Sequence, residues 1–307
     1  MIKRLCEINK LTKQGTIHDE MQYLNLIRDI LDNGVDVNGR NGETRAIYGA
    51  VMHFDLSKKT LPLLTTKKVA WKTCLKELLW FISGKTDNNI LQSNNVKIWN
   101  ENASREFLDK QGLVCNREGD LGPVYGHQWR HFNASYTDCD TDYTGKGIDQ
   151  LQNIVELLSN PETRTSRRII MSAWNPCQLS QMALPPCHVM CQFNVFNDKL
   201  SCTLYQRSAD VGLGLPFNIA SYAFLTHLLA HHCNLEASEL IINIGNAHIY
   251  SDHTDILKQQ LDREVYNFPK IDIVDSQDCT EIEDYTIENV KVQDYISHKV
   301  LKMKMRP

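Results

Sequence analysis

The chain has 307 residues, of which 42% are hydrophobic, and its formal net charge is −4 with both signs mixed along the sequence. This composition is sufficient for a sizeable core and lacks the basic face of a general nucleic-acid-coating protein, so we expect no DNA partner. No run of about 18 apolar residues occurs, and the charged N-terminus lacks the apolar segment of a signal peptide, so we expect no membrane span and no export signal.

Residues 1–17 form a polar lead-in, and we predict that residues 18–307 form one domain. Residues 18–33 carry Met21, Leu24, Ile27 and Leu31 at helical spacing, and Gly34 is a suitable stop. Residues 35–66 predict strands separated by turns, and 69–83 a second helix that ends at Gly84. Residues 112–149, which are rich in glycine and polar residues, predict a long functional loop region.

In the second half, residues 150–159 predict another helix, and 169–174, 189–196 and 200–207 predict strands. The last two strands flank Asn197-Asp198-Lys199, which is typical of a hairpin. A long apolar helix is expected from residue 218 to about 233, and short strands and loops from residue 261. This order predicts an α+β fold with one large mixed β-sheet flanked by helices.

The clearest chemical signal is the stretch Ala183-Leu184-Pro185-Pro186-Cys187-His188. Two prolines fix the backbone immediately before the cysteine, at the start of a strand, which is a suitable place for a nucleophile. A buried structural thiol is the alternative, since free cysteine is often simply buried. The ten cysteines are scattered without a C-x-x-C pair, so we expect reduced thiols, and the Cys187–Cys191 stretch lacks a fourth ligand for a metal.

A thiolate needs nearby positive charge, and arginines are available beside the predicted strands. Arg167 and Arg168 precede one strand and Arg207 ends another, so these side chains could bind a phosphate. Adjacent arginines in a solvated turn are the alternative.

Glu77, Asn218 and the pair His248 and Tyr250 are each open to two interpretations. Glu77 lies among apolar residues and is either a proton carrier with a raised pKa or an outward charge beside Lys76. Asn218 is either a helix N-cap or an amide that reads a base edge. His248 and Tyr250 are two residues apart, so on a strand they share a face and either bind sugar hydroxyls or pack.

Taken together, the chain from about residue 20 to its end closely resembles thymidylate synthases. The matching stretches are LPLLTTKKVAWK, KELLWFISG, VKIWNENASREFLD, GDLGPVYGHQWRHF, RRIIM, ALPPCH, LYQRSADVGLGLPFNIASYA and NAHIYSDH. The long 112–149 region is similar to that of the eukaryotic form. Because no dihydrofolate reductase segment precedes it here, the monofunctional rather than the fused type is expected.

The resemblance implies the thymidylate synthase/dCMP hydroxymethylase fold and reductive methylation of dUMP to dTMP, with 5,10-methylenetetrahydrofolate as co-substrate and no metal. The implied catalytic residues are Cys187, Glu77, Asn102, Tyr125, His188 and Asp210. The implied dUMP-binding residues are Arg40, Arg167, Arg168, Cys187, His188, Gln206, Arg207, Ser208, Asp210, Asn218, His248 and Tyr250. The implied folate-binding residues are Lys67, Ile98, Trp99, Asp210, Leu213, Gly214, Phe217 and Arg306.

The resemblance also implies a cytoplasmic homodimer, with a nuclear pool as a further option, in which Arg167 and Arg168 reach into the partner's site. Several positions depart from the family pattern. Asn246 replaces an aspartate, Ala70 and Asn194 replace aromatic residues, and the loop after Arg40 is one residue shorter. The chain ends Arg306-Pro307 where the family usually ends in small apolar residues.

Two rival functions stay open at this stage. A nucleotide hydroxymethylase of the same fold would let water, rather than hydride, react with the exocyclic methylene. A catalytically inactive relative kept for binding or regulation would carry out neither reaction. Product analysis distinguishes all three.

Overall fold

The computed structural model describes residues 17–39, 41–275 and 279–306. Arg40 and Pro307 lie outside the described residues, as does nearly all of the 1–17 lead-in. Contacts divide the chain into two compact units: residues 1–71, 196–274 and 290–306 form the first, and 72–195 and 275–289 form most of the second. The single domain over 18–307 stays a prediction.

Six strands form one mixed sheet in the order β1-β2-β6-β5-β4-β3, which confirms the predicted α+β class. A separate pair, β7 (Lys270–Ile273) and β8 (Val290–Gln293), is antiparallel. None of the helices in the described parts of the chain is both long enough and apolar enough to cross a membrane.

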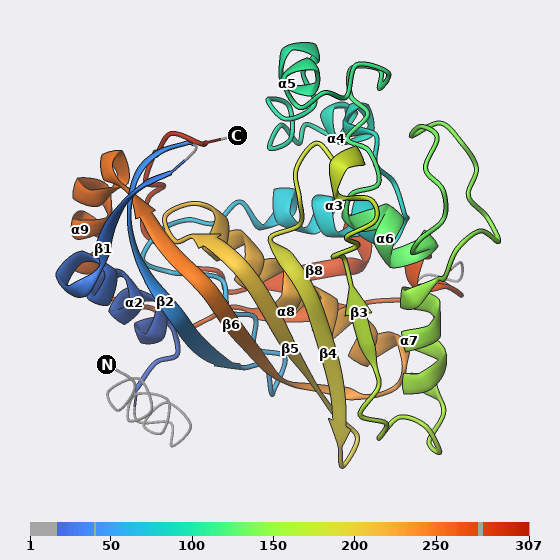
Figure 1. Ribbon diagram of the computed structural model, residues 1–307. Coiled ribbons are helices and arrows are strands. Elements are labelled where there is room, and N and C mark those ends of the chain that lie inside the picture. Colours follow the sequence, from blue (N-terminus) through green and yellow to red (C-terminus); the bar gives the residue numbers. More distant parts are fainter. Residues whose placement is uncertain (1–16, 40, 276–278, 307) are drawn as a thin grey trace. The chain divides into compact units, whose positions relative to one another are not determined.

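The first unit contains β1 (Val35–Gly39), β2 (Gly42–Asp55), β5 (Lys199–Asp210) and β6 (Glu236–Tyr250) (Figure 1). Strands β1 and β2 are antiparallel, as are β2 and β6, whereas β5 and β6 are parallel. Helix α8 (Gly214–His232) links the parallel pair and packs on both strands. Helices α2 (Glu20–Asn33) and α9 (Thr254–Leu261) pack against each other, and the short helix η2 (Ser251–His253) precedes α9.

The strand register of the first unit gathers its predicted site residues. Asp210 at the end of β5 pairs with His248 on β6, and Ser208 pairs with Asn246. Helix α8 begins four residues after Asp210, so its first turn lies at the carboxyl ends of two parallel strands. In α/β sheets this edge is the usual place for a ligand.

The second unit contains most of the helices of the middle of the chain. Its elements are α3 (Trp71–Ile82), α4 (Asn88–Ser93), α5 (Arg105–Lys110), α6 (Tyr125–His131), α7 (Gln150–Ser159), β3 (Ile170–Ser172), η1 (Leu179–Gln181), β4 (His188–Phe196), η3 (Ile282–Asp284) and η4 (Ile287–Asn289). Strands β3 and β4 are antiparallel, and α7 packs on both α6 and β3. The Asp149 carboxylate caps α7 by accepting the Gln152 N–H at 2.9 Å.

The structure corrects two predictions about local structure. Helix α8 begins at Gly214 and not at Asn218, because Pro216 falls in its first turn, where proline is tolerated. Asn218 is therefore not an N-cap. Within the predicted loop of residues 112–149, residues Tyr125–His131 form α6, which is too short for a periodic pattern and is stabilised by the buried Trp129.

Candidate active site

Cys187 lies directly before β4, at the end of the Pro-Pro turn, and is partly exposed. Its backbone N–H donates to the Tyr125 hydroxyl oxygen at 2.8 Å. Upstream in the same loop, the Ala183 N–H donates to the Leu121 carbonyl at 2.9 Å. The backbone around the thiol is thus fixed by α6 and the segment before it.

Gly122 makes this loop arrangement possible. Its φ is +74°, and a Cβ at this position would lie 1.9 Å from the Gln181 carbonyl oxygen. Only glycine permits so close an approach of two backbones together with this φ. The Gly-Pro-Val-Tyr-Gly motif therefore positions Tyr125 and the cysteine loop together.

Glu77 on α3 lies among aromatic rings. Its Oε1 accepts a hydrogen bond from the Trp99 indole N–H at 2.6 Å, whereas Lys76 donates to the Asn94 carbonyl instead. The interpretation of Glu77 as an outward charge beside Lys76 is therefore wrong. Burial raises the pKa of Glu77 to about 7, although the bond from Trp99 acts in the opposite direction. A carboxyl group with this pKa can gain and lose a proton at neutral pH.

Tyr125 connects this carboxyl region to the cysteine. Its ring centroid is 6.2 Å from that of Trp99 and 5.2 Å from that of the buried His188. Burial, reinforced by Cys187, raises the pKa of Tyr125 far above its ordinary value, so the hydroxyl stays protonated. Asn102 is buried, and its Nδ2 has no hydrogen-bond partner within the described residues. A buried unsatisfied donor is costly and suits a site that a ligand completes.

Asn218 on α8 is oriented by the buried Gln206. The Gln206 Nε2 donates to the Asn218 Oδ1 at 2.7 Å and to the Ser208 carbonyl at 3.0 Å. Because the Asn218 oxygen accepts from Gln206, its Nδ2 is directed elsewhere as a donor. This contact fixes the orientation of the Asn218 amide.

His248 and Tyr250 share one face of β6, as predicted, with ring centroids 5.4 Å apart in an edge-to-face arrangement. The His248 Nδ1 lies 3.0 Å from the Asn246 Oδ1. Burial lowers the pKa of His248, so the neutral ring is favoured near pH 7. Its tautomer is then set by Asn246, the residue that replaces the family's aspartate.

Asp210 and Lys67 meet at the turn after β5. The Asp210 Oδ1 accepts the Gly212 N–H at 2.9 Å, and the buried Lys67 donates from its Nζ to the Gly212 carbonyl. Burial lowers the pKa of Lys67 to about 8, although Asp210 opposes this shift. The pair therefore places a cation and an anion at the entrance of α8.

Glu20 fixes the segment directly before Lys67, and sequence reasoning missed it. Its fully buried carboxylate accepts both backbone N–H groups and both hydroxyls of Thr65 and Thr66, the residues directly before Lys67. The only sequence signal was an acidic residue in the first turn of a helix, a position that is usually exposed. Burial of such a charge requires several donors, and the Thr-Thr pair supplies four.

The remaining predicted residues are placed less specifically. Arg167 and Arg168 are exposed before β3, and the Arg167 carbonyl accepts a bond from the Gln192 side chain at 3.0 Å. Arg207 is half-buried on β5. Leu213, Gly214 and Phe217 are half-buried at the start of α8, and Ile98 is half-buried beside Trp99.

The predicted catalytic residues other than Asp210 lie in the second unit, and most predicted nucleotide and folate residues lie in the first.

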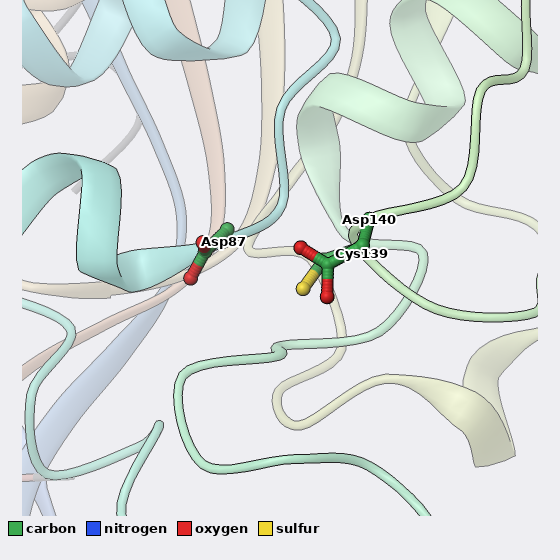
Figure 2. Close-up of side chains that lie close together, drawn as sticks. All are labelled: Asp87, Cys139 and Asp140. Atoms are coloured by element: carbon green, nitrogen blue, oxygen red, sulfur yellow. The ribbon is translucent and has the colours of Figure 1, made fainter.

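A separate group of metal-ligand residue types, Asp87, Cys139 and Asp140, has donor atoms within 4.8 Å of one another (Figure 2). Arg117 already neutralises both carboxylates, with its Nη2 2.8 Å from an oxygen of each. Burial and nearby carboxylates raise the pKa of the Cys139 thiol to about 12, so it is not a thiolate at neutral pH. We interpret this group as an ion-pair network.

Comparison with known proteins identifies the family. The family model described as thymidylate synthase matches residues 21–307. The chain is 50% identical to human thymidylate synthase and 49% identical to that of human herpesvirus 8, covering 94% and 98% of this chain and 91% and 88% of those proteins. It is 51% identical to the bifunctional dihydrofolate reductase-thymidylate synthase of Paramecium tetraurelia, over 94% of this chain but only 61% of that longer protein. This chain belongs to the thymidylate synthase family.

Proposed function

We propose that this chain methylates dUMP to dTMP, using 5,10-methylenetetrahydrofolate as both one-carbon donor and reductant and releasing dihydrofolate. The observation that carries the proposal is the family match over residues 21–307, which includes the cysteine loop held by Tyr125. One co-substrate supplies both the carbon and the hydride, so the family's reaction requires no metal.

The first steps use the Cys187 thiolate. Its sulfur adds to carbon 6 of the uracil ring, and the resulting enolate makes carbon 5 nucleophilic. Carbon 5 then attacks the folate methylene, and a proton leaves carbon 5 as tetrahydrofolate departs. The exocyclic methylene accepts a hydride from the folate while the sulfur leaves carbon 6, which gives dTMP and dihydrofolate.

We assign proton transfer to the Glu77 region, with Asn102 and Tyr125 as its neighbours. A carboxyl group with a pKa of about 7 can give a proton to the uracil carbonyl and recover it. His188, buried beside Tyr125, is assigned to the substrate site next to the cysteine.

We assign recognition of the base to Asn218. Uracil presents a carbonyl acceptor next to an imide donor. The Asn218 amide, held in one orientation by Gln206, can donate to the carbonyl and accept from the imide. Cytosine presents the reverse pattern, so a mismatched pair would disfavour dCMP. Sugar and phosphate contacts are assigned to Ser208, His248, Tyr250, Arg207 and Arg40, and folate contacts to Lys67, Ile98, Trp99, Asp210, Leu213, Gly214, Phe217 and Arg306.

We further propose a homodimer in the cytoplasm in which Arg167 and Arg168 complete the partner's phosphate site. Supporting this, both arginines are exposed, and the sheet strands carry large exposed apolar side chains. Tyr48 is 66% exposed, Tyr205 45% and Ile170 42%. Such residues on a sheet face suit burial against a second copy.

Mixed dimers test the shared site. Cys187→Ala and the double variant Arg167→Ala/Arg168→Ala should each be nearly inactive as homodimers. After unfolding and refolding an equal mixture, about half the dimers are mixed and each has one intact site, so roughly a quarter of wild-type activity should return. If mass analysis shows mixed dimers but no activity returns, the phosphate ligands belong to one chain.

Fluoro-dUMP with methylenetetrahydrofolate tests the covalent step. The wild-type protein should form a stable adduct whose peptide mass locates the modification at Cys187. An adduct on another cysteine would overturn the assignment of the nucleophile. Formation of hydroxymethyl-dUMP from dUMP would instead support the hydroxymethylase.

A further inference from the structure

The last residues of the described chain, which we call the tail (303–306), contact the end of β6 and the segment that follows it. The His253 Nε2 lies 2.8 Å from the Lys304 carbonyl oxygen. Arg306 forms an ion pair of 2.6 Å with Asp252 and lies over the Tyr250 ring, 5.5 Å from its centroid. The Arg306 and Asp252 side chains are both partly exposed, whereas His253 is fully buried.

The other ring nitrogen of His253 faces the site. Its Nδ1 lies 3.8 Å from the Asp210 Oδ1 and has no hydrogen-bond partner within the described residues, although it is buried. The same Asp210 oxygen accepts the Gly212 N–H, and Lys67 donates to the Gly212 carbonyl. A single imidazole therefore lies between the tail and the Asp210 turn.

Gly212 shows how closely these parts meet. A Cβ at this position would lie 2.8 Å from the His253 Nδ1 and 3.1 Å from the Met303 sulfur. Real Cβ atoms essentially never lie within 3.0 Å of another atom, so a side chain here would displace the His253 ring and press on Met303. At Gly214, by contrast, an added Cβ would have its nearest neighbour at 3.7 Å, an ordinary contact.

We propose that His253 is a positioning residue that couples docking of the tail to the orientation of Asp210. The inference rests on the proposed function, in which Asp210 and Arg306 belong to the folate site. Because a carbonyl only accepts, the His253 Nε2 must carry the proton that bonds to Lys304. A second proton, on Nδ1, lets the ring donate toward Asp210 at the same time, so the position of the tail and the orientation of Asp210 become linked.

The charges around His253 give this coupling a pH dependence. Asp210 on β5 and Asp252 on η2 face the ring, His248 on β6 lies nearby, and Arg306 is paired with Asp252. Burial opposes protonation of His253, but the nearby Asp210 and Asp252 carboxylates and the bond to the Lys304 carbonyl together raise its pKa above its ordinary value. Docking that depends on the charged ring is therefore strongest at low pH and weakens as the pH rises through the raised pKa.

Trypsin cleavage after Lys302 and Lys304 measures how often the tail undocks, with the released peptides quantified by mass. Rates at each pH are divided by those of a free peptide of residues 299–307, which removes the pH dependence of trypsin itself. His253→Ala should raise the normalised rate about tenfold, the effect of losing one buried hydrogen bond to a charged partner. His253→Gln can still donate to the Lys304 carbonyl, so it should restore most of the protection but abolish the increase in cleavage between pH 6 and pH 8.

Gly212→Ala provides a second route to the same outcome without removing the histidine. It should raise tail cleavage by a similar factor, whereas Gly214→Ala, the matched control, should leave it close to wild type. If His253→Ala does not fold, Gly212→Ala and His253→Gln still test whether His253 couples docking of the tail to Asp210. Unchanged cleavage in both Gly212→Ala and His253→Gln, with wild-type pH dependence in the latter, would overturn the proposal.

A kinetic measurement separates this role from a structural one. His253→Gln should raise KM for methylenetetrahydrofolate severalfold below pH 7, where the wild-type ring is charged, and should change the Kd for dUMP much less. Equal losses in dUMP and folate binding would also contradict the proposal. If the wild-type protein makes no dTMP, the proposed function fails, but the cleavage experiment still tests the coupling of the tail to Asp210 through His253.

Discussion

The cysteine loop and the tail differ in what holds them. The cysteine loop is fixed by backbone hydrogen bonds to Tyr125 and Leu121 and by a glycine contact that no side chain could replace. The tail is held by a histidine, an ion pair and a cation–aromatic contact, all of which respond to charge. This difference supports our proposals that the nucleophile is positioned before substrate arrives and that the tail docks reversibly beside the Asp210 turn.

The largest expected effect comes from removing the nucleophile. Cys187→Ala should reduce kcat by at least about 10⁴-fold, because covalent activation of the ring has no substitute. Thermal unfolding should change little, since the thiol is only partly buried and its N–H bond to Tyr125 is retained. Steady-state kinetics and calorimetry together check this prediction. Comparable activity in the variant would mean that the loop is rigid for another reason.

Glu77→Gln tests the proton-transfer region and should lower kcat by about 10²- to 10⁴-fold. It should also remove the part of the pH–rate profile that titrates near pH 7, the pKa of this carboxyl.

The same variant has a stability consequence whose sign follows from linkage. The folded-state pKa is raised from 4.5 to about 7, so the native protein binds the extra proton between these values and loses stability as the pH rises through that window. Glu77→Gln should therefore raise Tm relative to wild type more at pH 8 than at pH 5. Glu101→Gln, at an exposed position, should show no such difference. Equal Tm changes at both pH values would contradict a buried carboxyl.

Asn218 and Gln206 provide a test of intermediate size. Asn218→Asp should shift the ratio of dUMP to dCMP activity by about a hundredfold toward dCMP. Gln206→Leu should reduce discrimination by about tenfold, because Asn218 loses the donor that fixes its orientation. Gln92→Leu on the exposed face of α4 is the control. A wild-type ratio in both site variants would remove Asn218 from base selection.

The smallest expected effect is at the Arg306–Asp252 pair, which is partly exposed. Asp252→Asn should raise normalised tryptic cleavage of the tail by about two- to fivefold at low salt, and this increase should shrink in high salt. Asp255→Asn, in the first turn of α9 and 90% exposed, should have no effect. An Asp252 effect that is insensitive to salt would point to a packing role instead.

Periodic patterns and turn residues predicted the α+β class and several helices and strands, but not α4, α5 or the bounds of β6. The helix at residues 150–159 was predicted with its observed bounds, and the Asn197-Asp198 turn has positive φ at both residues, as a tight hairpin requires. The same patterns placed the start of α8 four residues too late, at Asn218, whereas Pro216 fits the first turn of a helix that begins at Gly214. The short α6 was missed since seven residues carry too little periodicity.

For the candidate site, the motifs identified the chemical groups but not the contacts that orient them. The raised pKa of Glu77 depends on the burial of its carboxyl group beside Trp99, which lies 22 positions away in the sequence. Glu20 and His253 were missed because each acts through residues that are distant along the chain. Such side chains look ordinary in sequence, and only the tertiary structure shows what they touch.

The most direct test of the central claim is to analyse the products that purified protein forms from dUMP and methylenetetrahydrofolate. We predict dTMP and dihydrofolate in equal amounts, with neither product formed by Cys187→Ala. Hydroxymethyl-dUMP accompanied by tetrahydrofolate, or no product from a folded protein that binds dUMP, would contradict it.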